Sequence, residues 1–105
     1  MNKNISLFEY QKLIDKWILA HGGYWPPLSM LSAIVEEVGE LAKEINHLEG
    51  HKPKKADEAE KHLGEELADV IFSIICVANY YKIDVNRELS LVIDKFTKRD
   101  SERFV

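Results

Sequence analysis

The sequence contains few of the residues that cross-link or stiffen small secreted domains. Its 105 residues include one cysteine, three prolines and five glycines. One cysteine excludes an internal disulfide, and Cys76 lies in an apolar stretch, so we expect a buried thiol in a reducing compartment. No signal-peptide pattern follows Met1, and the longest apolar run, residues 70–78, is too short to span a bilayer. These absences predict a cytoplasmic protein with no membrane partner.

Positive charge is also scarce. The chain has 14 lysines and arginines against 18 aspartates and glutamates, which gives a formal net charge of −4. Binding to a nucleic-acid polymer through bulk charge requires a basic protein, so we expect no such partner. Hydrophobic residues make up 46% of the sequence and can fill the core of one domain, residues 1–105. Because a domain of this size is only modestly stable alone, a homo-oligomer is a reasonable expectation.

Helical periodicity is the only regular pattern in the chain. Ser6 and Glu9 have the capping-box spacing, and Gly22 and Gly23 follow as a stop signal. No strand-like alternation competes with this pattern. The spacing predicts four helices with short links: from Ser6 to Gly22, from Ser29 or Ser32 to Gly50, from Asp57 to about Tyr81, and from Asp84 to about Asp100. We therefore expect an all-α, four-helix bundle.

The second predicted helix carries one broad apolar stripe. Its members are Leu31, Ile34, Val35, Val38, Leu41, Ile45 and Leu48.

Carboxylates interrupt the apolar faces of two predicted helices. Asp69 lies directly before Val70 and Ile71, where a charge is costly to desolvate without a positive partner. Glu66 and Asp69 are three residues apart, as are Glu37 and Glu40 on the preceding helix, so each pair projects from one flank of its helix. If the two helices pack through their apolar stripes, the two pairs meet.

Converging carboxylates repel one another and take up protons unless a cation lies between them. Magnesium prefers carboxylate, water and phosphate oxygens, so the pattern predicts a magnesium site. A solvated surface is the simpler interpretation for the remaining glutamates, and Glu36 fits either interpretation. Only Glu44 with His47 has the Glu-x-x-His spacing of di-iron bundles, and the histidines are too scattered for zinc.

At this point the residues resemble a known family. EEVGE at residues 36–40 and EELAD at residues 65–69 resemble the EExxE…ExxD signature of the MazG-like all-α nucleoside triphosphate pyrophosphohydrolases. The similarity extends over about residues 20–104, through GYWPPLSM and KFTKRDSERF. The chain resembles a short, single-domain branch of that group.

The resemblance implies magnesium-dependent cleavage of a nucleoside triphosphate between its α- and β-phosphates, with manganese as a substitute metal. It assigns the metal to Glu37, Glu40, Glu66 and Asp69, and gives Glu36 a role in catalysis, either at a second metal or in activating water. Family members form dimers or tetramers. For this protein we expect an activity that clears unwanted or non-standard nucleotides. The preferred base and sugar and the number of bound metal ions stay open.

Cations and aromatic residues are candidates for substrate binding. Lys95, Arg99 and Arg103 are four residues apart in a row that suits phosphate, although an ordinary basic helix end has the same pattern. Trp25 is the preferred residue to stack on a base, because Trp17 falls on an apolar stripe typical of core residues. Asn79 ends the apolar helix, where it could contact a phosphate or cap a turn.

Two other functions fit the same residues. One is a non-catalytic helical module that self-associates and holds a structural cation. The other is a hydrolase of a different phosphorylated small molecule.

Overall fold

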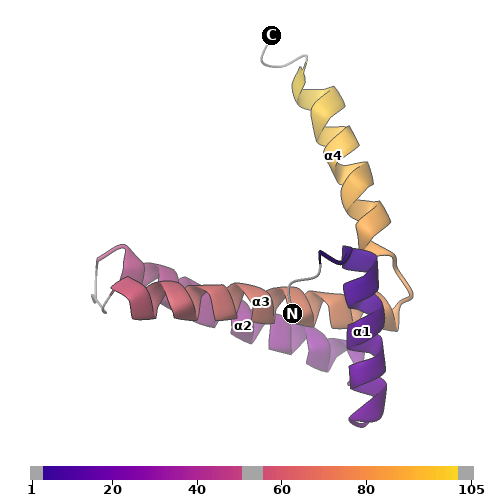
Figure 1. The fold of residues 1–105 in the computed structure, drawn as a ribbon, viewed down its shortest axis with the longest axis horizontal. Helices are drawn as coiled ribbons and strands as arrows, with labels where there is room; N and C mark the ends of the chain where they lie inside the picture. Colours follow the sequence, from indigo (N-terminus) through magenta and orange to yellow (C-terminus); the bar gives the residue numbers. More distant parts are fainter. Residues whose placement is uncertain (1–3, 51–55, 102–105) are drawn as a thin grey trace.

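The structure, a computed structural model, describes residues 4–50 and 56–101, and the side chains of residues 4–50 and 62–100 (Figure 1). These residues form four helices: α1 (Leu7–Ala20), α2 (Pro27–Leu48), α3 (Ala56–Tyr80) and α4 (Val85–Ser101). No strand occurs in the described part of the chain. The all-α prediction with four helices is confirmed.

Local signals in the sequence determine most helix ends. The Ser6 hydroxyl accepts a hydrogen bond from the Glu9 N–H at 3.1 Å, and the Asp84 carboxylate accepts one from the Arg87 N–H at 3.1 Å. Both side chains satisfy donors that have no partner inside a helix. α2 begins earlier than predicted, at Pro27, because proline lacks the N–H that would be unpaired in a first turn.

The helices do not form a compact bundle within one chain. α2 and α3 lie side by side and antiparallel, α1 crosses the end of α3, and α4 extends away from the pair (Figure 1). The main contacts of α4 are with α1. The radius of gyration is 16.8 Å, whereas a compact domain of this length would have about 13 Å. The described chain is therefore extended.

Two apolar rows, one residue apart, replace the single stripe predicted for α2. One row meets α3 along a seam and is buried or half-buried, and the other is 44–63% exposed and continues onto α3. The seam comprises Met30, Ile34, Glu37, Leu41, Glu44 and Leu48 of α2 with Leu63, Glu66, Val70, Ser73 and Val77 of α3. The exposed row, the apolar face, comprises Leu31, Val35, Val38 and Ile45 of α2 with Leu67, Ile71 and Ile74 of α3.

The antiparallel pair has two chemically different sides. Each residue of the apolar face follows a seam residue by one position, a rotation of about 100°. Glu36, Glu40 and Asp69 each precede a seam residue and are rotated the opposite way. Because the helices run antiparallel, equal rotations on the two helices point to the same side of the pair. The apolar face and the carboxylates therefore lie on opposite sides, and we call the second one the acidic face.

Few apolar residues are buried among those that the structure describes. They are Met30, Ile75, Cys76 and Ala78. Burial raises the pKa of the Cys76 thiol, as expected for a free cysteine in the core. Within the described ranges, no helix combines the length and apolar character needed to cross a membrane.

Candidate functional site

Three carboxylates from α2 and α3 converge where the seam meets the acidic face. Glu37, Glu66 and Asp69 each place one oxygen within 4.8 Å of the others. Glu37 and Glu66 are half-buried members of the seam, and Asp69 is exposed at its edge, one helical turn beyond Glu66. We call these residues the carboxylate trio.

The electrostatics of the trio are unfavourable without a cation. The Oε2 atom of Glu66 is buried and has no hydrogen-bond partner among the described residues. Burial raises the pKa of Glu66, and the charges of Glu37 and Asp69 raise it further. The folded protein therefore favours the neutral form of Glu66 more than the unfolded chain does.

The donor set suits a hard divalent cation. Three carboxylate oxygens from two adjacent helices can share one ion, and the buried oxygen of Glu66 has no other partner in the described structure to satisfy it. Glu40 is exposed, and its charge also raises the pKa of Glu66, but its oxygens are not among those that converge. Glu36 is exposed on the same acidic face. The assignment of metal ligands stays a prediction.

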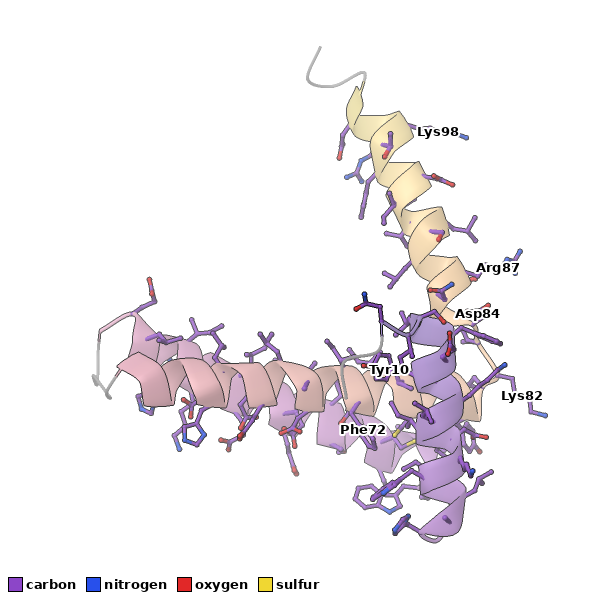
Figure 2. The ribbon with its side chains drawn as sticks, in the orientation of Figure 1. Tyr10, Phe72, Lys82, Asp84, Arg87 and Lys98 are labelled. Atoms are coloured by element: carbon purple, nitrogen blue, oxygen red, sulfur yellow. The ribbon has the colours of Figure 1, made fainter. Side chains whose placement is uncertain are left out.

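An aromatic group lies next to the trio on the same face. Phe72 is one turn beyond Asp69 and, like it, precedes a seam residue; it lies on the part of α3 beside α1 (Figure 2). The Trp17 ring of α1 meets Phe72 edge-on, with ring centroids 6.1 Å apart, and stacks on His21 at 4.1 Å. The Nδ1 atom of His21 lies 2.7 Å from the Trp17 carbonyl, which holds the imidazole in place.

The exposed fractions of Trp17 and Trp25 bear on which of them is free to stack on a nucleobase. Trp17, expected in the core, is 53% exposed. Trp25 is 64% exposed in the link before α2. His21 was missed in the sequence, although its spacing of four residues from Trp17 is the signal that places both rings on one helix face.

The predicted phosphate-binding cations lie on α4. Lys95 and Arg99 flank the Phe96 ring, with Nζ at 5.2 Å and Cζ at 4.8 Å from its centroid. Arg99 also pairs with Asp100 at 3.0 Å. Because α4 extends away from α2 and α3 (Figure 1), one chain does not bring these cations to its own carboxylate trio. Arg103 lies outside the described residues.

Asn79 does not lie beside the carboxylates. It lies about 15 Å beyond Asp69 along α3 and forms hydrogen bonds with Gln11 of α1, so the structure does not bring it to the carboxylates.

Comparison with known proteins shows the family of the chain. Residues 26–104 match the family model of the MazG nucleotide pyrophosphohydrolase domain. The chain belongs to this family. The matched MazG region includes the carboxylate trio, Lys95 and Arg99, whereas Trp17 and His21 precede it.

MazG-like relatives match most of the chain. YpjD from Bacillus subtilis, an uncharacterized protein, is 45% identical over 100 residues, which cover 94% of this chain and 90% of YpjD. A crystal structure of B. subtilis YPJD, described as a proposed pyrophosphatase, superposes with a TM-score of 0.81 at 38% identity, covering 90% of this chain and 98% of that one. The Bacillus-conserved MazG protein, a nucleotide pyrophosphohydrolase, superposes with a TM-score of 0.80 at 35% identity, covering 96% and 99% of the two chains.

Membership of this MazG family supports a hydrolase activity on pyrophosphate linkages. It also supports the fold class, since the similar structures are MazG-type all-α proteins.

We expect Glu66→Gln to raise the melting temperature of the metal-free protein at pH 8, because the amide removes one of three crowded negative charges. The gain should shrink as the pH falls through the raised pKa of Glu66, since the wild-type carboxyl then becomes neutral as well. Thermal denaturation in the presence of a chelator measures both effects.

Glu65→Gln is the matched control, because Glu65 is the exposed neighbour and lies outside the trio. It should change the melting temperature little. A Glu66→Gln protein no more stable than wild type at pH 8 would contradict the electrostatic account.

Proposed function

We propose that this protein is a magnesium-dependent nucleotide pyrophosphohydrolase, which cleaves a nucleoside triphosphate to a monophosphate and pyrophosphate. The convergence of Glu37, Glu66 and Asp69 across the seam carries this proposal. The MazG family membership supports the same class of reaction. Clearance of non-standard nucleotides in the cytoplasm is the role we infer.

In this proposal Glu37, Glu66 and Asp69 hold magnesium or, as a substitute, manganese, and Glu40 adds negative charge beside them. The metal would neutralise phosphate charge and lower the pKa of a water molecule. Glu36, exposed on the acidic face, is the carboxylate we assign to accept a proton from the attacking water. The seam limits water access to Glu66, which strengthens the electrostatic interactions of its carboxylate.

Asp69→Asn should reduce pyrophosphate release from nucleoside triphosphates by roughly 100-fold or more, because the Asn amide cannot hold the metal as firmly as the carboxylate. The protein should stay folded, because Asp69 is exposed. The measurement is product analysis over a panel of ribo- and deoxynucleoside triphosphates with magnesium, with circular dichroism as the check on folding.

The products of the same assay also distinguish the proposed function from the two alternatives. Release of single phosphate would favour a different phosphohydrolase. No product from any nucleotide, together with a rise in stability on adding magnesium, would favour a non-catalytic module with a structural cation.

We further propose that the working form is a homo-oligomer, a dimer or a tetramer. The chain exposes 8478 Å², whereas a compact monomer of 12.1 kDa exposes about 6,000 Å². Large apolar side chains are exposed on the apolar face of α2 and α3 and along α4. Exposed apolar surface of this extent is typical of an interface between subunits. A second copy of the chain is the partner that we assign to it.

The assembly also resolves the separation of cations from carboxylates. Because α4 extends away from its own α2 and α3, we propose that Lys95 and Arg99 of one subunit serve the carboxylate trio of another. Their charges would balance the phosphates that the metal does not neutralise.

Subunit mixing tests this exchange. Asp69→Asn protein and Lys95→Ala/Arg99→Ala protein should each be nearly inactive, yet equal mixtures after subunit exchange should recover about a quarter of wild-type activity if the assembly is a dimer. Half of the dimers are then mixed, and each has one intact site. No recovery in mixtures shown to contain mixed oligomers would place the cations and carboxylates in the same chain.

For the nucleobase we propose Trp17, supported by His21, in place of Trp25. Trp17 is half exposed, and its ring contacts two aromatic neighbours, His21 and Phe72. Phe72 is one helical turn beyond Asp69 on α3, so Trp17 is the aromatic residue that we assign to stack on the base of a nucleotide whose phosphates reach the metal.

Trp17→Ala should raise KM for the best nucleotide about 5- to 150-fold, the value of one base–aromatic stack, whereas Trp25→Ala should change KM little. Inhibition by inorganic tripolyphosphate, which has no base, should be unaffected by either change. An equal loss of tripolyphosphate binding in Trp17→Ala would mean that Trp17 supports the fold of the site and not the base.

A further inference from the structure

Two amide side chains join α1, the end of α3 and the start of α4. Gln11 is 6% exposed. Its Nε2 donates to Asn79 Oδ1 at 3.0 Å and to the Ile83 carbonyl at 2.9 Å, and its Oε1 accepts from the Val85 N–H at 2.9 Å. Asn79 Nδ2 donates in return to the Gln11 carbonyl at 2.9 Å. We call Gln11 and Asn79 the polar joint.

The polar joint holds the turn that sets the direction of α4. Lys82 has a φ of 58°, and the Ile83 N–H donates to the Ala78 carbonyl at 2.8 Å, so the chain turns sharply after α3. The Gln11 carboxamide binds backbone groups on both sides of Asp84, the residue that caps α4. Figure 2 shows Lys82 and Asp84 beside α1, where this turn lies.

Few other contacts fix α4. Its main packing is on α1, the helix that carries Gln11, and it has no substantial packing on α2 or α3 in the described structure. Replacing a buried amide by an apolar side chain leaves its former partners unpaired, and they then seek water or a new geometry. Here the former partners include backbone groups on both sides of Asp84, so a new geometry for them would change the angle of α4.

We propose that Gln11 is a positioning residue, which fixes the angle of α4 and thereby the place of Lys95 and Arg99 in the assembled enzyme. The proposal has a structural half, the angle of α4, and a functional half, the placement of Lys95 and Arg99. The functional half rests on the phosphate-binding role proposed for those cations. Arg99 lies about 21 Å along α4 from Val85, so a tilt of about 10° moves it by about 4 Å. Lys98 marks the far end of α4 in Figure 2 and shows how far this end lies from the turn after α3. A displacement of about 1 Å can already cost about 100-fold in rate.

Gln11→Leu tests the proposal, because it keeps the approximate size of the side chain and removes all three of its amide hydrogen bonds. Ile75→Val is the matched control. Ile75 is 3% exposed on α3, so the change loosens the core without removing a hydrogen bond of the joint.

The first measurement is a distance between spin labels at Lys16→Cys on α1 and Asp94→Cys on α4, in a Cys76→Ala background. Labelled protein is diluted into unlabelled protein so that only distances within a chain are recorded. We expect one narrow distribution for the parent and for Ile75→Val, and a shifted or broadened one for Gln11→Leu. An unchanged distribution in Gln11→Leu would overturn the proposal.

The second measurement is kinetic. Gln11→Leu should raise KM for the nucleotide about tenfold or more, while the magnesium concentration for half-maximal activity stays the same. In a Lys95→Ala/Arg99→Ala background, which is nearly inactive, the same change should weaken nucleotide binding no further, because the groups that it positions are gone. A shifted distance with an unchanged KM, or an equal further loss in that background, would refute the functional half.

The two measurements separate this inference from the proposed function. If the wild-type protein releases no pyrophosphate from any nucleotide, the proposed function fails and the functional half fails with it. The spin-label distances still decide whether Gln11 sets the angle of α4.

Discussion

The mutual repulsion of three carboxylates on the seam between α2 and α3 is the constraint on which the rest of the structure depends. Glu37 and Glu66 occupy positions in a row that otherwise holds mostly apolar side chains. A stable core would place Leu or Val there, and the cost of the acidic residues appears in the raised pKa of Glu66. A cation between the carboxylates would offset this repulsion, so the energetic cost of the acidic seam and the chemistry that we propose for it have one cause.

The pairing of α2 with α3 also divides the chain into two sides. One side carries the carboxylates and is crossed by α1 through contacts such as Trp17 with Phe72. The other side carries an apolar face that no helix of the same chain covers to a substantial extent in the described structure. Exposed apolar surface of this extent is typical of an interface between subunits, which is why we propose a homo-oligomer. In that proposal assembly and site formation are linked, because α4 carries the phosphate-binding candidates and extends away from α2 and α3 of its own chain.

Much of the candidate site could be predicted from sequence because its residues break the pattern of their surroundings. Glu66 and Asp69 interrupt an apolar helix, and the caps at Ser6 and Asp84 depend only on neighbours three residues away. Other features depended on partners far along the chain. Glu37 was expected on the flank of α2 and lies in the seam, because the predicted stripe was two rows and one helix cannot reveal which row meets α3. The hydrogen bonds between Asn79 and Gln11 connect residues 68 positions apart, and no local pattern reveals such a contact.

The sequence by itself determined the four helices, the N-terminal caps of α1 and α4 and the chemical character of the acidic residues, because each depends on residues within one or two helical turns. Tertiary structure alone decided which carboxylates meet, that Trp17 is exposed beside them, and that α4 points away from its own site. These outcomes depend on the rotation of each helix about its axis and on the angle between helices. Both are set by packing between segments far apart in the chain, and a change of one residue in the contact row moves a side chain about 100° around its helix.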